Sequence, residues 1–229
     1  MKYKTLLFDA DMTLFDFKKA EEVALTQTLE KHGHPAGDVV VQRYSVINDE
    51  LWKALEKGQL KREDLVVERF RRLFEELNIC DDAAQFNQEY MSTLAELPIL
   101  LDGAQELCES LHGKYRMYII TNGSAVVQHR RFSKSVLLPY FEDYFISEET
   151  GSQKPQRAYF DYVRANIPDW DAESTLVIGD SLSSDIQGAI NYGLDSCWLN
   201  LYNSDYTLTQ PCSYEVHDLK ELKELLHTI

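Results

Sequence analysis

Three short apolar runs, far apart in the chain, each end at a polar residue that can take part in chemistry. The runs and their final residues are Leu6–Phe8 before Asp9, Tyr118–Ile120 before Thr121, and Leu176–Gly179 before Asp180. A continuous apolar run of this kind is typical of a strand that is covered by helices on both faces. Because the carboxyl ends of parallel strands meet at one crevice, we expect the three polar residues to lie close together.

Helix-like segments separate the predicted strands and define the fold class. Strands are predicted over residues 5–8, 115–120, 144–146, 176–178 and 196–199. Helices are predicted over residues 102–112, 124–135, 155–166, 186–192 and 219–226, with Asp102 as a capping residue and Pro155 in a first turn. Strands that alternate with helices imply right-handed crossovers, so we expect an α/β fold with a Rossmann-like, doubly wound parallel sheet.

After the first strand, a long segment with a different sequence pattern interrupts this alternation of strands and helices. The segment is charged and helix-favouring, and its apolar residues recur every three or four positions, as at Phe70, Leu73, Phe74 and Leu77. No strand pattern is evident in it. We therefore expect two domains, with these bounds: an α/β core of residues 1–15 and 98–229, and an inserted all-helical cap domain of residues 16–97.

The overall charge limits the classes of partner. The 229 residues carry a formal net charge of -15. A nucleic-acid polymer is disfavoured as a partner, because proteins that bind one need clustered Lys and Arg. A small phosphorylated ligand is compatible with this charge, since a local cationic pocket can lie within an acidic surface.

The chain carries no sign of export or of a membrane span. Its first residues lead directly into a predicted strand, whereas a secretory signal has a basic segment followed by an apolar one. No apolar run approaches the roughly 20 residues that span a bilayer. Cys80, Cys108, Cys197 and Cys212 are widely spaced, without a zinc or disulfide pattern. We expect reduced thiols and a cytoplasmic protein without membrane contact, as a monomer or homodimer.

Four polar motifs follow one another along the chain. The first places Asp9 and Asp11 at a strand end, which alone is a weak signal because aspartate also forms turns. The remaining motifs are Thr121-Asn122-Gly123, Lys154-Pro155 and Gly179-Asp180-Ser181-Leu182-Ser183-Ser184-Asp185. The sequence lacks the glycine-rich phosphate-binding loops G-x-G-x-x-G and G-x-x-x-x-G-K-[ST]. Any bound phosphate must therefore be held by other residues.

With these motifs in this order, and with a helical insertion after the first, the chain resembles the haloacid dehalogenase superfamily, in its subclass with a helical cap. The resemblance covers the whole chain. It implies that Asp9 is a nucleophile that forms an aspartyl-phosphate, and that Asp11 is first the general acid and then the base. It also implies phosphate contacts from Thr121, Asn122 and Lys154.

The resemblance further implies a Mg²⁺ ion, bound by Asp9, Asp180 and the backbone carbonyl of Asp11. Asp185 would act through a metal-bound water or by orienting Lys154. With Asp11 protonated, the three ionised aspartates would be balanced by the metal and one lysine. Two carboxylates about 4 Å apart repel by roughly 4 kcal/mol at an effective dielectric near 20, so loss of the cations should be costly. Oxygen ligands favour magnesium over zinc.

Other reactions of the superfamily remain alternatives. Dehalogenases use the first aspartate but lack the second acid, so Asp11 favours phosphate chemistry, whereas mutases share both aspartates and stay open. Phosphonate-cleaving relatives need a cap lysine, and Lys18 and Lys19 fit a solvated surface better. Met12 stands where the family usually has glycine, which puts the geometry of the first loop in question but leaves the catalytic atoms untouched.

Several stretches resemble the bacterial pyrimidine 5'-nucleotidase branch of the superfamily. They are residues 47–52 and 68–70 in the predicted cap, and residues 149–155 and 195–200 in the core. A nucleobase needs a flat apolar surface and a few polar contacts, which Trp52, Phe70, Asn48 and Arg69 can supply. The two aromatic residues also fit the core of the cap, and the two polar ones also fit hydrogen bonds within it.

The sequence therefore predicts a Mg²⁺-dependent phosphomonoester hydrolase, most specifically a nucleoside monophosphate 5'-nucleotidase that prefers pyrimidine nucleotides. One alternative is a phosphatase of a sugar phosphate or another small phosphorylated metabolite. A second is a non-catalytic relative that binds a metabolite or a partner protein. The presence of Asp9, Asp11, Lys154 and Asp180 argues against the second alternative.

Overall fold

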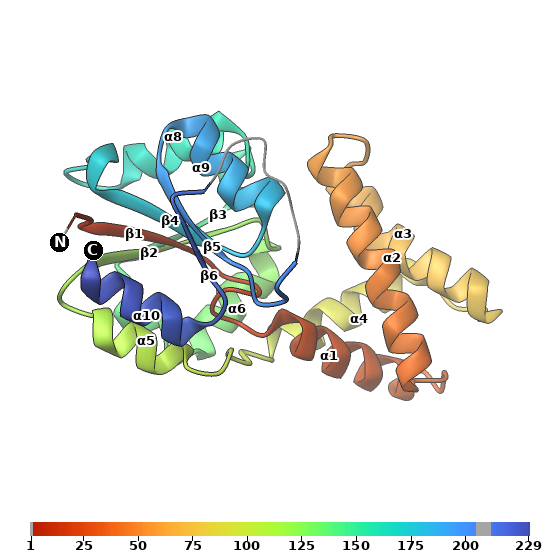
Figure 1. The fold of residues 1–229 in the computed structure, drawn as a ribbon. Helices are drawn as coiled ribbons and strands as arrows, with labels where there is room; N and C mark the ends of the chain where they lie inside the picture. Colours follow the sequence, from red (N-terminus) through yellow and green to blue (C-terminus); the bar gives the residue numbers. More distant parts are fainter. Residues whose placement is uncertain (1, 205–211) are drawn as a thin grey trace. The chain divides into compact units, whose positions relative to one another are not determined.

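A parallel sheet lies at the centre of the α/β part of the chain (Figure 1). The computed structural model describes residues 2–204 and 212–229. Within these residues the sheet has six strands, in the spatial order β3-β2-β1-β4-β5-β6. They are β1 (Thr5–Asp9), β2 (Arg116–Thr121), β3 (Asp143–Ile146), β4 (Thr175–Gly179), β5 (Asp195–Leu199) and β6 (Tyr214–Val216). The predicted doubly wound α/β fold is confirmed.

The place of β1 between β2 and β4 brings distant parts of the chain together. Leu6 of β1 lies opposite Met117 of β2 and opposite Leu176 of β4, and both pairings are parallel. The segments that leave the carboxyl ends of these three strands therefore start next to one another. This is the point at which the strand order reverses, where open α/β sheets bind their ligands.

Helices cover both faces of the sheet (Figure 1). They are α5 (Ala104–Leu111), α6 (Ala125–Lys134), α7 (Ser147–Thr150), α8 (Arg157–Asn166), α9 (Gln187–Tyr192) and α10 (Leu219–Thr228), with the short helical turns η1 (Leu138–Tyr140), η2 (Ala172–Ser174) and η3 (Leu182–Ile186). Leu6 and Phe8 pack with α5, α6 and α10, whereas Leu7 packs with α8 and α9. Because successive strand residues point to opposite faces, the buried strands contribute to two separate cores.

Three local predictions were wrong. β6 was not expected, because a strand of three residues is too short to show a period. Gly103, with φ +84°, rather than Asp102 is the N-terminal capping residue of α5. Pro155 precedes α8 instead of lying in its first turn, since Gln156 caps that helix. The Lys154–Pro155 peptide bond is cis.

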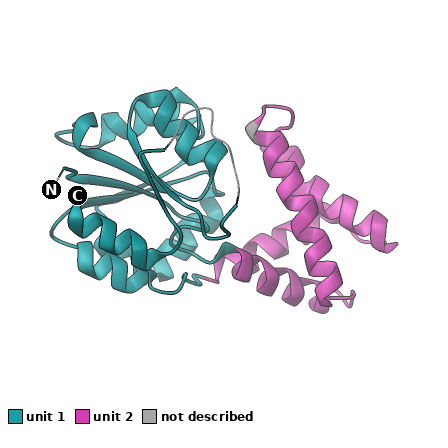
Figure 2. Cartoon of the chain, in the orientation of Figure 1, with its two compact units in different colours: residues 1–17, 98–229 teal, residues 18–97 magenta. Residues whose placement is uncertain are grey.

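Most of the segment between β1 and β2 forms a second compact unit, hereafter the helical unit (Figure 2). It comprises Lys18–Leu97, and the α/β unit comprises Met1–Phe17 and Pro98–Ile229. Its helices are α1 (Phe17–Lys31), α2 (Asp38–Glu56), α3 (Arg62–Leu77) and α4 (Ala83–Ala95). An all-helical insertion in the α/β fold is thus present, as the change of sequence texture predicted.

The helical unit has its own aromatic core. The ring of Phe70 stacks on that of Tyr44 with 5.2 Å between centroids, and it contacts the ring of Phe86 at 4.8 Å. Phe74 packs against Phe86 at 5.1 Å. The stripe that the sequence predicts along α3 is therefore core, because Phe70, Leu73 and Phe74 are all buried.

Within the described part of the chain, no helix has the length and apolar character needed to cross a membrane. The four cysteines are unpaired, in agreement with the expectation of reduced thiols. Cys108 and Cys197 are buried in the α/β unit, where they behave as small apolar side chains.

Candidate active site

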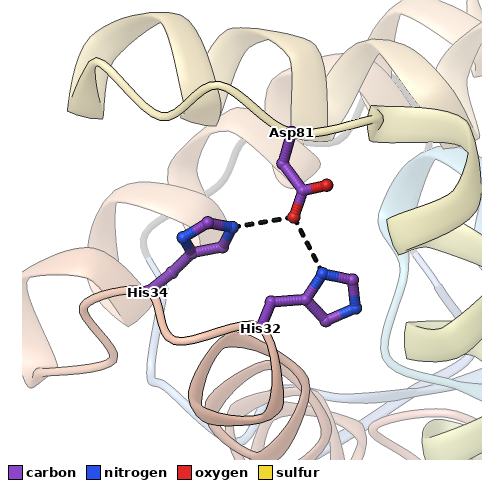
Figure 3. Close-up of side chains that lie close together, drawn as sticks. All are labelled: His32, His34 and Asp81. Carbon is purple, nitrogen blue, oxygen red and sulfur yellow. Dashed lines mark hydrogen bonds and ion pairs between the residues drawn. The ribbon is translucent and has the colours of Figure 1, made fainter.

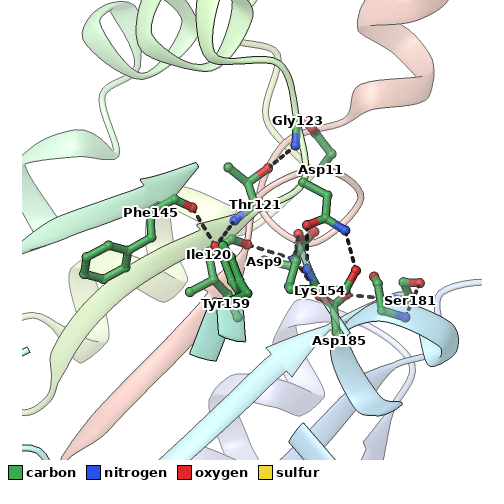
Figure 4. A network of polar contacts seen from close by, with 12 residues as sticks. Asp9, Asp11, Ile120, Thr121, Gly123, Phe145, Lys154, Tyr159, Ser181 and Asp185 are labelled. Carbon is green, nitrogen blue, oxygen red and sulfur yellow. Dashed lines mark hydrogen bonds and ion pairs between the residues drawn. The ribbon is translucent and has the colours of Figure 1, made fainter. Parts of the chain in front are cut away.

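One lysine ammonium group is fully buried where the strands end (Figure 4). Lys154 Nζ donates to Asp9 Oδ1 at 2.5 Å, to Asp185 Oδ1 at 2.6 Å and to the carbonyl oxygen of Ile120 at 2.9 Å. The three hydrogens of the ammonium group are thus all used. Burial lowers the pKa of Lys154, but attraction by Asp185 and Asp9 outweighs burial and holds the pKa above its usual value. The lysine therefore remains charged.

The partners of this lysine come from segments that the sheet brings together. Asp9 is the last residue of β1, and Asp180 directly follows β4. Asp185 lies in η3, the turn of π-helix after β4, and Lys154 lies between α7 and α8. Because β1 and β4 are adjacent and parallel, their carboxyl ends place Asp9 and Asp180 in the same cluster.

Asp9, Asp180 and Asp185 form an acidic cluster in which carboxylate oxygens lie within 4.8 Å of one another. Burial raises the pKa of Asp9 to about 7, against the opposing effect of Lys154. Burial also raises the pKa of Asp180, and repulsion from Asp9 and Asp185 acts in the same direction. Removal from water disfavours a charged carboxylate, so full ionisation of Asp9 and Asp180 calls for more positive charge. A donor set of oxygen atoms suits a hard divalent cation.

The turn after β4 is held from several sides. A Cβ atom on Gly179 would lie 2.3 Å from Asp185 Oδ2, so this close approach requires glycine. The N–H of Ser181 donates to the same Oδ2 at 3.1 Å. Trp198 Nε1 donates to the carbonyl oxygen of Asp180 at 2.9 Å. These contacts fix the backbone that carries both aspartates.

The hydroxyl group of Thr121, at the end of β2, is arranged as a donor. Its oxygen accepts from the N–H of Gly123 at 3.0 Å and from Gln128 Nε2 at 2.9 Å. Within the described residues its own hydrogen has no acceptor, so it can donate to a bound oxyanion. The N–H of Thr121 donates to Tyr159 Oη at 3.1 Å, which anchors the strand end.

Asn122 holds the backbone of Lys154. Its Nδ2 donates to the carbonyl oxygen of Lys154 at 2.9 Å, and its Oδ1 accepts from the N–H of Lys154 at 3.0 Å. The two bonds join the loop after β2 to the segment that carries the buried lysine. The side-chain amide of Asn122 is engaged in this way, and its predicted contact with phosphate stays a prediction.

Two residues of α6 hold Asp11, the second aspartate of the first motif. Arg131 Nη1 donates to Asp11 Oδ1 at 2.5 Å, and Gln128 Nε2 donates to Asp11 Oδ2 at 2.8 Å. Arg131 is fully buried, with Cζ 4.8 Å from the ring centre of Phe15. Its Nε and Nη2 have no hydrogen-bond partner among the described residues. Asp11 is therefore the carboxylate that balances a buried cation.

Gln128 and Arg131 were not among the predicted site residues. Both lie on the buried face of α6, next to Val127 and Phe132. A polar side chain on an apolar helix face needs a partner, and these two recur at a spacing of three, which aligns them on one face. That spacing, in the helix that follows the Thr121 motif, is the signal that could have found them.

The predicted substrate-binding residues of the helical unit have partners within that unit. Asn48 and Arg69 are buried, and Arg69 Nη1 donates to Asn48 Oδ1 at 3.3 Å. Asn48 Nδ2 donates in turn at 2.7 Å to Glu21 Oε2, a buried carboxylate that the sequence analysis did not single out. Trp52 is partly exposed, with Arg62 Cζ 5.1 Å from its ring centre.

Comparison with known proteins assigns the family. The chain matches the haloacid dehalogenase-like hydrolases over residues 3–193, and it therefore belongs to this family of enzymes. The family predicted from the four motifs is thereby confirmed.

Similar proteins include two pyrimidine 5'-nucleotidases. The chain is 40% identical over 228 residues to PynA of Streptococcus pneumoniae, which covers 99% of this chain and 96% of that protein. It is 32% identical over 233 residues to YjjG of Escherichia coli, which covers 99% of both. The crystal structure of the putative HAD-hydrolase YfnB from Bacillus subtilis, bound to magnesium, matches with a TM-score of 0.94 and 41% identity over 99% of both chains. The predicted resemblance to the nucleotidase branch is confirmed.

Proposed function

We propose that this chain is a Mg²⁺-dependent phosphomonoester hydrolase that acts on nucleoside monophosphates, preferentially pyrimidine ones, through an aspartyl-phosphate on Asp9. The observation that carries the proposal is the cluster of Asp9, Asp180 and Asp185, in which Asp9 and Asp185 accept from the buried ammonium group of Lys154. Three carboxylates and one lysine leave an excess of negative charge where the strands end. A divalent cation and the phosphate it binds complete such a site.

The donor set fits Mg²⁺. Its side-chain donors are carboxylate oxygens, and burial raises the pKa values of Asp9 and Asp180, so a bound cation would favour their ionised forms. We assign the ion to Asp9, Asp180 and the backbone carbonyl of Asp11, with Asp185 in a supporting position as the partner of Lys154. Mg²⁺ at this site would neutralise charge on the phosphate oxygens. The magnesium-bound structure of YfnB supports the choice of magnesium as the metal.

The proposed reaction has two steps, in which one hard displacement is divided into two easier ones. Asp11 first takes up a proton, for which one of its oxygens must release Arg131 or Gln128. A carboxylate oxygen of Asp9 then attacks phosphorus, and the ester oxygen leaves with the proton of Asp11. Water then attacks the phosphorus of the aspartyl-phosphate, and Asp11 accepts the proton that the water loses. Inorganic phosphate is released, and the Asp9 carboxylate is restored.

The remaining residues orient the reacting groups. Lys154 Nζ holds Asp9 Oδ1, and its charge would stabilise the transferred phosphoryl group. The hydroxyl hydrogen of Thr121 would donate to a phosphate oxygen. Gln128 and Arg131 fix the carboxylate of Asp11 through its two oxygens. Asn122 would contribute by fixing the backbone of Lys154, in addition to the phosphate contact that the family resemblance implies.

The nucleotide preference rests on the relatives, since PynA and YjjG are pyrimidine 5'-nucleotidases with 40% and 32% identity over nearly the whole chain. Among the residues predicted to contact substrate in the helical unit, Trp52 offers a partly exposed ring for a base. Asn48 and Arg69 already bond to each other, so we propose that they support the fold of the unit.

A panel of phosphate esters tests the proposal. With saturating Mg²⁺, kcat/KM should be higher for dUMP, UMP and dTMP than for AMP, GMP and sugar phosphates. If sugar phosphates are hydrolysed faster than the pyrimidine nucleotides, the chain is a phosphatase of a different small metabolite and the nucleotidase proposal is wrong. If no ester is hydrolysed under any metal condition, the phosphatase proposal fails as a whole.

Capture of the intermediate tests the mechanism separately. Acid quenching during turnover of a good substrate, followed by peptide mass spectrometry, should find one phosphoryl group on the peptide that contains Asp9. The Asp11→Asn variant lacks the group that activates water, so it should accumulate this species. A phosphoryl group on any other residue would contradict the assigned nucleophile.

A further inference from the structure

Two imidazoles and one carboxylate converge in the helical unit (Figure 3). His32 Nδ1 lies 2.8 Å from Asp81 Oδ2, and His34 Nε2 lies 2.7 Å from the same oxygen. The histidines follow α1, and the aspartate lies between α3 and α4. Three possible metal ligands from two separate turns therefore lie within 4.8 Å of one another.

The backbone orients the two imidazoles and one carboxylate oxygen toward one another. The N–H of Asp82 donates to Asp81 Oδ1 at 2.7 Å, so Oδ2 is the oxygen that faces the imidazoles. Between the two histidines, Gly33 has φ +73°, a conformation that a side chain disfavours. This turn brings both histidines of the His-Gly-His sequence to the same carboxylate.

The second nitrogen of His32 also has a carboxylate neighbour. His32 Nε2 lies 3.3 Å from Glu89 Oε2, and Lys31 Nζ donates to the same oxygen at 2.5 Å. A neutral imidazole cannot donate from both nitrogens. A metal ion on Nδ1 would let Nε2–H donate to Glu89, which is the usual arrangement of a metal-binding histidine. Both contacts of His32 are thus satisfied either by an imidazolium that donates from both nitrogens or by a neutral imidazole with an ion on Nδ1.

The walls of the cluster are partly apolar. The ring of His32 packs edge-on against Phe86 at 5.0 Å, and that of His34 against Phe74 at 5.9 Å. The side chains of His32, His34 and Asp81 are 15%, 18% and 22% exposed. An ion bound here would be sheltered by aromatic rings, and water could still reach it.

We propose that His32 Nδ1, His34 Nε2 and Asp81 Oδ2 bind a divalent transition-metal ion, Zn²⁺ in preference to Mg²⁺, with water as the fourth ligand. Imidazole nitrogen suits zinc, whereas oxygen-only sites suit magnesium. Tetrahedral sites with bonds of about 2.0–2.1 Å hold ligand atoms about 3.3 Å apart, so each nitrogen and the oxygen would separate by about half an ångström. Small rotations of the side chains accomplish this.

The ion would act as a structural link. It would join the turn after α1 to the turn before α4, two segments that otherwise meet here through hydrogen bonds and ring packing. This site differs from the acidic cluster of the α/β unit in donor atoms and in the metal it selects. It does not depend on the proposed phosphatase activity.

Calorimetric titration of the full chain with Zn²⁺ tests the proposal. The protein is first treated with a chelator, and the titration is done with saturating Mg²⁺ in an Asp180→Asn background that weakens the acidic cluster. We expect about one equivalent of Zn²⁺ to bind and to raise the thermal unfolding midpoint. His34→Gln and Asp81→Asn should abolish this binding, and Glu89→Gln should weaken it about 10–100-fold.

Two controls separate the site from ordinary surface binding. His129 Nε2 lies 2.6 Å from Glu149 Oε1, one imidazole beside one carboxylate, so His129→Gln should bind Zn²⁺ as the parent does. Cys80 is exposed and adjacent to Asp81, so Cys80→Ser tests for binding by the thiol and should also leave the affinity unchanged. Because Glu89→Gln keeps all three ligands, its graded loss of affinity remains informative even if a ligand variant fails to fold.

Three results would overturn the proposal. The parent protein could bind no Zn²⁺, it could bind equally well after His34→Gln, or it could lose binding after Cys80→Ser. Co²⁺ substitution adds a spectroscopic check, since ligation by nitrogen and oxygen lacks the thiolate charge-transfer band that a cysteine site would show.

Discussion

Each of the two units buries a cluster of charged side chains, and the clusters differ in how their charges are balanced. In the α/β unit, Lys154 donates to Asp9 and Asp185, and Asp180 adds a third carboxylate to the same cluster. In the helical unit, the carboxylate of Glu21 and the guanidinium of Arg69 are bridged by Asn48. Arg69 Nη2 donates further to Asn87 Oδ1 at 2.7 Å. The first cluster has an excess of negative charge, and the second is balanced within itself.

The difference separates a site for a ligand from a support for the fold. Burial raises the pKa of Glu21 to about 7, but Arg69 opposes the shift, and the side chains of Ser45 and Asn48 donate hydrogen bonds to the carboxylate. A buried network whose members satisfy one another needs nothing from outside. The acidic cluster cannot be satisfied in this way, so its charge calls for a cation and the anion that the cation binds. If charge balance distinguishes the two units, substitutions in the acidic cluster should lower activity, and substitutions in the balanced network should lower stability.

The largest effect is expected from Asp9→Asn. Loss of the nucleophile should reduce kcat by roughly 10⁴-fold or more. The fold should survive, because Lys154 keeps its contact with Asp185 and one buried negative charge is removed. Steady-state kinetics and thermal unfolding measure the two effects, with Asp102→Asn, a change at an exposed aspartate of the same unit, as control. Comparable activity of the two variants would contradict the role assigned to Asp9.

In the helical unit, Arg69→Met should act on stability instead of chemistry. It leaves the buried carboxylate of Glu21 without its cation, so the free energy of unfolding should fall by about 3–5 kcal/mol. Replacement of both partners, in Glu21→Leu/Arg69→Met, should restore much of this loss. Chemical denaturation measures the free energies. An Arg69→Met variant of normal stability but raised KM for nucleotides would show that Arg69 contacts substrate, and the contrast between the units would fail.

Magnesium should stabilise the α/β unit in a manner that depends on pH. The pKa of Asp9 is about 7 in the folded protein without metal, against an ordinary 3.8, so the folded state favours the neutral form. The metal-free protein should therefore lose stability as the pH rises from about 4 to about 7. Mg²⁺ binds the ionised carboxylates, so its effect should be largest above pH 7.

The expected size of this effect follows from mass action. At a Mg²⁺ concentration of 100 times Kd, the gain is about 2.7 kcal/mol, which corresponds to about 5–10 °C in the unfolding midpoint. Differential scanning calorimetry at pH 5 and pH 8, with and without Mg²⁺, measures it. Asp9→Asn should show a smaller gain at pH 8. Equal gains at the two pH values would indicate that the ion does not bind at the acidic cluster.

The strands and the residues at their ends were predictable, because they depend on burial and topology alone. β1 was expected over residues 5–8 and spans Thr5–Asp9, since a run covered on both faces has few polar interruptions. The meeting of Asp9 and Asp180 follows from the adjacency of β1 and β4. β6 could not be found, because it is a short strand at the end of the sheet and is only partly buried.

Side-chain partners were less predictable, because they depend on packing between elements. The contact of Arg131 with Asp11 joins residues 120 positions apart. The hydrogen bond from Asn48 to Glu21 shows that Asn48 belongs to a buried network. The spacing of residues within one helix does not reveal a contact between two helices. Asn122 was expected to donate to phosphate, which stays a prediction, and the bonds of its amide to the backbone of Lys154 were not foreseen. Residue type and strand position predicted which residues form the candidate site, but not which hydrogen bonds hold each side chain.

The smallest effect concerns two residues with left-handed backbone, one in each unit. Met12 follows Asp11 with φ +61°, in the position where the family usually has glycine, and Asn78 ends α3 with φ +53°. A left-handed conformation costs an ordinary residue about 1–2 kcal/mol, and asparagine tolerates it better. Glycine also loses about 0.5–1 kcal/mol in chain entropy, so Met12→Gly should raise the free energy of unfolding by less than about 1 kcal/mol. Asn78→Gly should change the free energy of unfolding by only about a few tenths of a kcal/mol. Met12→Ala keeps the backbone strain, so it should not raise the free energy of unfolding. If Met12→Gly lowers stability as much as Met12→Ala does, packing of the half-buried Met12 side chain outweighs backbone strain in this loop, and methionine is the better residue there.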